Sequence, residues 1–199
     1  MENVENLRKL LGRPVVSVET ANELGHVNDV LADPLTGRLA GFSVKRLDES
    51  SALVSVIDVH GIGPDAIMVE RDESLVLIDA SPINTIPRMK ADLIGVKVMT
   101  KRGHLLGNIS DASLCLLREP VFIYEVRSSI FDKLLGHAFY FAASLGCAFA
   151  ADRSALVVSD DSSVMEHSLE AAAKRLLGSV EIQLHDPTAI RVEIRSQLS

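Results

Sequence analysis

Two copies of one short pattern, about 82 residues apart, constrain the fold of this chain more than any other feature of its sequence. Three segments recur in the same order, pairing residues 10–17 with 93–100, 24–29 with 106–111, and 39–44 with 121–126. The offset is 83 residues for the first pair and 82 for the other two, so one loop residue is lost between the first two segments. Because glycine, aspartate and the apolar alternation keep their register, the pattern indicates a duplicated β-rich unit.

Length and composition are compatible with two small domains. The chain has 199 residues, enough for one medium domain or two small ones, and the repeat favours two. Apolar residues make up 47% of the chain but aromatic residues only 4%, and tryptophan is absent, so the cores must consist of Val, Leu, Ile and Ala. We predict a first unit at residues 1–80, a linker at 81–90, a second unit at 91–161 and an extension at 162–199.

Short strands separated by turn signals predict small barrels rather than a parallel sheet. In the first copy, the predicted strands are residues 14–18, 24–31, 39–45, 53–59 and 66–69. Turn-forming residues at 20–23, 33–37 and 61–64 separate them. We expect the apolar run at 75–78 to close the first barrel or to pack between the units, and the second copy to repeat the scheme.

The extension is predicted to form a helix followed by a β-hairpin. Ser163 and Glu166 form a capping-box pattern, and Gly178 stands where a helix commonly ends. Between them an apolar stripe recurs at helical spacing, at Met165, Leu169, Ala172, Ala173, Leu176 and Leu177. Alternation at 180–184 and 190–194 predicts a hairpin with one apolar face. Both elements need a surface to cover, so we expect them to dock on the second unit or across the pair.

The order of these motifs resembles the PRC-barrel family, whose barrel occurs in the photosynthetic reaction-centre H subunit and in a ribosome-maturation factor. The resemblance rests on residues 10–17, 23–30, 33–44 and 57–69. It is weaker over residues 91–158, where Leu117-Arg118-Glu119-Pro120 replaces the family's Asp-x-x-x-Gly turn. The resemblance implies a mainly β fold of two small barrels in tandem, and a role in assembly and interaction without shared active-site residues.

Three positions of the repeat keep a glycine or an aspartate in both copies, and we interpret these six residues as structural repeat positions: Gly12 and Gly95, Gly25 and Gly107, Asp29 and Asp111. The glycines suit tight bends or positive φ. The aspartates are expected to accept hydrogen bonds from backbone amides near the hairpin, and this structural role is favoured over a functional carboxylate.

No residue pattern indicates catalysis, a cofactor or a metal. The six histidines show no H-x-x-H, HExxH or H-x-E spacing. Nucleophile-elbow, catalytic-cysteine, dinucleotide-binding and Walker-type motifs are also absent from the sequence. Cys115 and Cys147 are expected to be reduced, buried thiols. We therefore predict a protein that is not an enzyme and has neither catalytic, cofactor-binding nor metal-binding residues.

Charge and segment length bear on the partners. The formal charge of −7 disfavours a phosphate backbone as ligand, and no apolar run reaches the ~20 residues of a membrane span. The first residues lack the features of a signal peptide, so a cytoplasmic location is expected. We predict an adaptor or assembly factor for a protein partner, with RNA or ribosome association as the alternative.

The candidate interaction surface lies on the first unit and comprises Glu23, His26, Asn28, Pro34 and Arg38. Self-association is left open. A small-molecule site is a third hypothesis, which a ligand-sized cavity would favour, since small barrels are usually filled by side chains.

Overall fold

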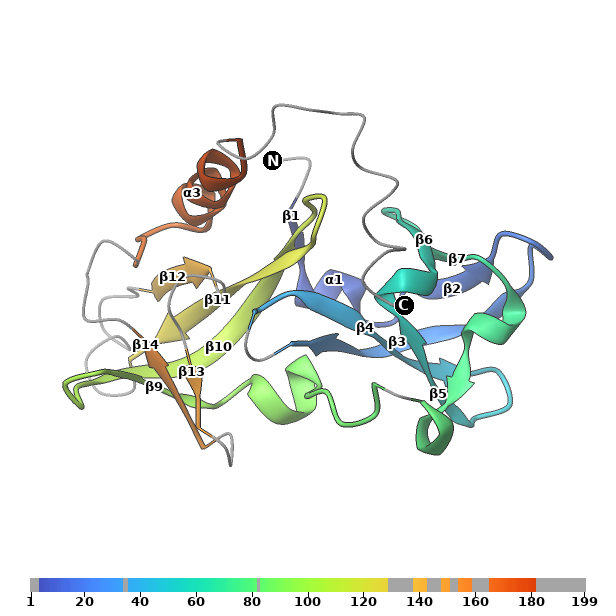
Figure 1. The fold of residues 1–199 in the computed structure, drawn as a ribbon, viewed down its shortest axis with the longest axis horizontal. Coiled ribbons are helices and arrows are strands. Elements are labelled where there is room, and N and C mark those ends of the chain that lie inside the picture. The colour runs from blue at the N-terminus through green and yellow to red at the C-terminus, as the bar shows by residue number, and fades with distance from the viewer. Residues whose placement is uncertain are drawn as a thin grey trace, which may run out of the picture.

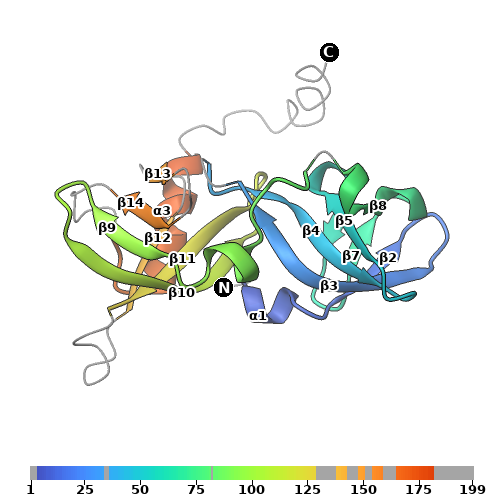
Figure 2. The ribbon, with the colours of Figure 1, turned by 90° about the horizontal axis from the view of Figure 1, so that it is seen from below.

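A computed structural model shows two curved β-sheets and a helix near the end of the described chain (Figure 1). The structure describes residues 4–33, 36–81, 83–128, 138–142, 148–150, 154–158 and 165–181. Seen from below, the two sheets lie end to end, with the helix over one of them (Figure 2). The mainly β fold predicted from the sequence is confirmed, and each sheet curls into a half-barrel.

The first sheet contains seven strands formed by the first copy of the repeat. They are β2 (Pro14–Ser17), β3 (Glu23–Ala32), β4 (Leu39–Arg46), β5 (Ser51–Ser55), β6 (Val59–Ile62), β7 (Ile67–Val69) and β8 (Val76–Leu77). Their spatial order is β6-β7-β2-β3-β4-β5-β8. β8 pairs with β5 and forms one end of the sheet, so the apolar run at 75–78 extends the sheet without joining it to β6 at the other end.

The second sheet repeats the order of six of these strands, without a counterpart of β8 among the described residues. Its strands are β9 (Lys97–Thr100), β10 (Leu105–Cys115), β11 (Val121–Arg127), β12 (Ala138–Ala142), β13 (Ala148–Phe149) and β14 (Ala155–Val158). Their order is β12-β11-β10-β9-β14-β13, which matches the order of the equivalent strands in the first sheet. Each sheet also contains one parallel pair, β2 with β7 and β9 with β14. The sequence repeat is therefore a structural repeat.

Repeated glycines allow the long hairpin strands to approach their neighbours. Gly25 and Gly107 have φ of +151° and +150°, where a side chain is strained. A Cβ at Gly25 would collide with the carbonyl oxygen of Lys45, and one at Gly107 with that of Arg127. Gly12 and Gly95 also have positive φ, so the backbone conformation expected from the repeat is confirmed.

The two units exchange their opening segments. The short strand β1 (Val4–Asn6) precedes the first sheet in the chain but pairs with β10 of the second. Helix α1 (Leu7–Leu10) also packs against β10, while the equivalent π-helical turn Met89–Leu93 packs against β3 of the first unit. Each unit is thus covered by the segment that leads into the other.

Asp29 fixes this exchange by hydrogen bonds. Its buried carboxylate accepts the backbone N–H of Lys90 at 2.8 Å and of Ala91 at 3.0 Å, in addition to that of Val30. Backbone amides were the expected donors, but two of them belong to the turn Met89–Leu93 that leads into the second unit rather than to the hairpin. A single buried apolar cluster runs through both units, so the division at residues 80 and 91 stays a prediction.

Two local predictions in the first unit and the extension were wrong. The predicted strand 53–59 is interrupted, because β5 ends at Ser55 and a 3₁₀ turn (Val56–Asp58) precedes β6. Helix α3 (Leu169–Glu181) begins after Ser168, whose Oγ accepts the N–H of Ala171 at 3.1 Å.

The start and the end of α3 both differ from the prediction for physical reasons. Glu166 exchanges two backbone hydrogen bonds of 2.8 Å with Tyr140, which keeps it extended and outside the helix, while Ser163 lies outside the described residues. The helix continues through Gly178, since a glycine costs only about 1 kcal/mol in a helix interior. Val180 and Glu181 are therefore helical, and the rest of the predicted hairpin lies outside the described residues.

The apolar stripe of α3 docks on the second sheet, as predicted. Leu169, Ala172, Ala173 and Leu176 pack against β11 and β12 over a cluster that includes Cys115 and Ile123. On the exposed side of the helix, Glu170 and Lys174 form the expected ion pair at 2.9 Å.

Candidate interaction surface

The structure divides the residues of the predicted interaction surface between two places. Three of them are exposed on β3: Glu23 is its first residue, and His26 and Asn28 lie two residues apart further along. The Nε2 atom of His26 is 3.6 Å from the carboxylate of Glu23. Arg38 lies at the opposite end of the β3–β4 hairpin, and Pro34 lies outside the described residues. Whether these residues bind a partner stays a prediction.

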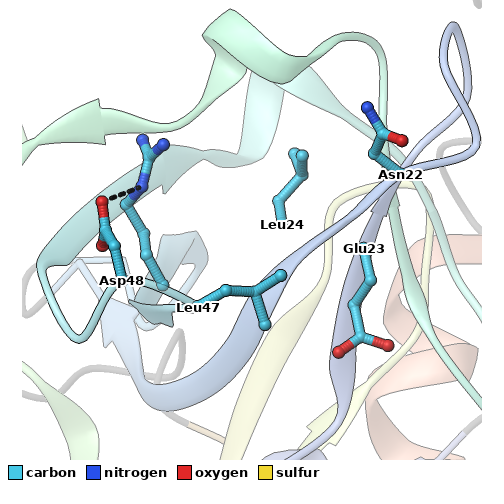
Figure 3. Close-up of a pocket in the computed structure, with 6 residues that line it drawn as sticks. Asn22, Glu23, Leu24, Leu47 and Asp48 are labelled. Carbon is cyan, nitrogen blue, oxygen red and sulfur yellow. Dashed lines mark ion pairs between the residues drawn. The ribbon is translucent and has the colours of Figure 1, made fainter.

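A shallow pocket lies at the Glu23 end of the hairpin (Figure 3). It has a volume of about 390 Å³ and is lined by residues 22–24 and 46–48. Leu47 is 64% exposed at its rim, and Arg46 lies 3.9 Å from Asp48. Hydrogen bonds from Ser50 hold the pKa of Asp48 below its usual range, so this carboxylate is a poor general base.

A second hollow, the inter-unit groove, has a volume of about 630 Å³ and lies where the two units meet. Residues 56, 57 and 59–62 of the first unit form one wall, and residues 116–120 of the β10–β11 turn form the other. Arg38 and Leu39 also line it. Most of these side chains are apolar.

The 3₁₀ turn before β6 explains the character of the first wall. By interrupting the strand, it lets Val56 and Val59 pack against the core while Ile57 is left 64% exposed. A large apolar side chain with this exposure is informative when other apolar residues surround it, because contiguous exposed apolar surface marks interaction sites.

The second wall is tied to the first unit by backbone hydrogen bonds and one ion pair. Leu39 donates its N–H to the carbonyl of Pro120 at 2.8 Å, and Phe122 donates to the carbonyl of Gly37 at 2.9 Å. Arg38 Nη2 lies 2.6 Å from the carboxylate of Glu119. These contacts join the hairpin ends of the two units, so the groove is preformed.

The charges at the groove are unequally balanced. Arg38 is paired with Glu119, and the ring of His60 lies 3.1 Å from Glu70. Arg118 is exposed at the second wall and forms no ion pair with the described residues. The groove therefore presents one unpaired cation beside an apolar surface.

The described residues offer neither hollow a cluster of metal ligands. No three His, Cys, Asp or Glu side chains within this part of the chain lie close enough to hold a metal ion. Cys115 is buried and not in a disulfide, and burial raises the pKa of its thiol, which disfavours the reactive thiolate. Cys147 lies outside the described residues.

Sequence reasoning missed the groove because its walls are about 60 residues apart in the chain. One signal pointed to it: the turn Leu117-Arg118-Glu119-Pro120 departs from the pattern of the resemblance and carries apolar and basic residues. Ile57 carried no comparable signal. It is exposed because of the turn Val56–Asp58, whereas the apolar residues at 53–59 predict a continuous strand.

Comparison with known proteins agrees with the fold. None of the helices in the described part of the chain has the length and apolar character required to cross a membrane. No curated protein matches the chain. The family model described as PRC-barrel domain matches residues 2–76, which cover the first sheet almost completely. The second sheet has the same strand order. Residues 2–76, which form the first unit, are therefore similar to the PRC-barrel family, as the order of the sequence motifs predicts.

Proposed function

We propose that this protein is a non-catalytic adaptor that binds a partner protein in the inter-unit groove. The observation that carries the proposal is the exposed apolar side chain of Ile57 beside the apolar wall of the β10–β11 turn. Burial of such a side chain contributes about 1.5–3 kcal/mol relative to full exposure, which makes it a suitable anchor for a partner.

The tandem arrangement supports the same proposal. Each wall of the groove comes from a different unit, and the exchanged segments and Asp29 hold the units together. A single unit would present only one wall. Duplication therefore supplies a binding surface that neither copy has alone.

RNA is a less suitable occupant of this groove. Its lining residues include no Phe, Tyr or Trp side chain on which a base could stack, and the ring of His60 lies against Glu70. Arg118 is the one cation there without an ion pair among the described residues. The formal charge of −7 also opposes a polyanion.

The test is an affinity purification from the native cells with the full chain and two variants. Ile57→Asp places a charge in the groove, and Leu47→Asp places the same charge at the shallow pocket; both parent residues are 64% exposed. We expect a set of proteins that resists nuclease, is lost with Ile57→Asp and is kept with Leu47→Asp. Capture that is unchanged by Ile57→Asp would contradict the proposal, and ribosomal proteins that disappear with nuclease would favour RNA association instead.

A further inference from the structure

The inter-unit groove runs along the edge of a strand. β6 is an edge strand of the first sheet, and among the described residues it pairs only with β7. All four of its residues, Val59 to Ile62, line the groove. Successive side chains of a strand point to opposite faces, so a hollow lined by four consecutive residues faces the edge of the strand and its backbone N–H and C=O groups.

This edge lacks two of the features that commonly protect a strand against pairing. Sheet edges are commonly protected by lysine, proline or a covering segment, and β6 contains neither lysine nor proline. Gly61 has no side chain, and a Cβ built there would meet nothing within 4 Å. Another backbone can therefore approach β6 closely. The register shift between Val59 and Gly61 on the β7 side restricts such pairing to a short segment.

The opposite wall is fixed and apolar. Leu116 packs against the main core, and Leu117 packs against the cluster beneath α3. Together with Ile57, these side chains offer apolar contacts to one face of a strand lying beside β6. Alternate side chains of that strand would meet them, while the remaining ones would point to solvent.

The unpaired charge of Arg118 indicates which charge a segment bound in the groove should carry. Glu119 is already paired with Arg38, whereas Arg118 has no ion pair among the described residues. Because the Debye length is about 8 Å at physiological ionic strength, Arg118 acts on a bound segment more strongly than the distant net charge of the chain. A carboxylate is the group that complements it.

We infer that the groove binds an extended segment of a partner protein, which adds as a strand to the free edge of β6, buries alternate apolar side chains against Ile57 and the β10–β11 turn, and places a carboxylate near Arg118. This inference rests on the proposed adaptor function and specifies the chemistry of the partner. Backbone pairing supplies affinity, and the apolar contacts and the carboxylate supply specificity.

The test begins with random peptides of about 12 residues displayed on phage, long enough to span the roughly 13 Å of β6, and selected on the immobilised full chain. Selected sequences are expected to alternate apolar residues with polar ones and to contain Asp or Glu. The affinities of the corresponding labelled peptides, measured by fluorescence anisotropy, should fall at least about tenfold with Ile57→Asp and remain within about twofold with Leu47→Asp.

Two further measurements separate strand addition from other modes of binding. N-methylation of alternate peptide amides should abolish binding for the set that faces β6 and spare the other set. Arg118→Glu should lower the affinity for the acidic peptide by about tenfold. Replacing the acidic residue of the peptide with lysine should restore binding to this variant.

Equal effects of N-methylation at both sets of amides, peptides with helical spacing of their apolar residues, or no peptide that depends on Ile57 would each overturn the inference. The adaptor function would survive such a result if the native partner were still lost with Ile57→Asp. The proposed adaptor function would fail, and the strand-addition inference would stand, if Ile57→Asp kept the native partner while the selected peptides behaved as expected.

Discussion

Replacing Asp29 with alanine is expected to loosen the attachment of the two units. The carboxylate accepts the N–H groups of Lys90 and Ala91, and hydrogen bonds to a charged group contribute about 1.5–3 kcal/mol each. Lys90 and Ala91 are exposed residues, so water can replace part of what is lost. We therefore expect Asp29→Ala to lower the free energy of unfolding by about 2–4 kcal/mol.

The repeat supplies a matched control at Asp111. Its carboxylate accepts the N–H of the next residue at 2.8 Å, as Asp29 does, but its contacts with the other unit are weak. They consist of the Asn6 amide at 3.4 Å and an ion pair of 3.3 Å with Arg8, whose side chain is 80% exposed. Exposed ion pairs contribute about 0–1 kcal/mol, and both aspartates lose the bond to the next residue, so Asp111→Ala should lower the free energy of unfolding clearly less than Asp29→Ala does.

The assay is urea unfolding followed by far-UV circular dichroism, because the chain contains no tryptophan. Free energies come from linear extrapolation for the parent chain, Asp29→Ala, Asp29→Asn and Asp111→Ala. Asp29→Asn keeps one acceptor oxygen and should give an intermediate loss. Equal losses at positions 29 and 111, or a loss below about 1 kcal/mol for Asp29→Ala, would refute the reasoning.

Three other changes test separate features of the fold. Gly25→Ala should lower the free energy of unfolding by about 2 kcal/mol or more, because its Cβ would collide with β4 at a positive φ. Gly61→Ala should change it by no more than about 0.5 kcal/mol. Equal melting temperatures of the two variants would contradict this. Truncation at Asp161 removes α3 and should lower the Tm and increase the binding of a hydrophobic dye, whereas an unchanged melt would show that the helix is dispensable. A hydrogen bond from Thr20 lowers the pKa of Asp72 in the folded protein. The contribution of Asp72 to the free energy of unfolding is therefore complete above the usual aspartate pKa, and it is lost as the pH falls through the lowered pKa of the folded state. Tm measured from about pH 5 to about pH 2 should thus fall less steeply for Asp72→Asn than for the parent chain.

The strands of the first unit could be predicted because their signals are local. Alternation at residues 24–31 and 39–45, with turn residues between them, specifies β3 and β4 to within two residues. Positive φ at Gly25 and Gly107 followed from their equivalent places in the repeat. The exact ends of α3 could not be predicted, because a backbone pairing between Glu166 and Tyr140 overrides the capping pattern.

The candidate site could be predicted only in part. Arg38 belongs to the predicted surface and lines the inter-unit groove, but the apolar anchor Ile57 and the turn around Arg118 were not included. Their proximity depends on hydrogen bonds that join the hairpin ends of the two units, such as that from Leu39 to Pro120. No local pattern encodes a contact between residues so far apart in the chain.

The sequence by itself determined the composition of the fold: a duplicated β unit, its strands, its special glycines and an amphipathic helix. These features depend on the conformational preferences of residues and on spacings of two to four positions, which the chain carries wherever it folds. The tertiary structure alone decided that β1 joins the second sheet, that Asp29 binds the opposite unit, and that two distant walls enclose a groove. Such pairings depend on which surfaces meet when the two units pack, because their stability comes from contacts that no single segment contains.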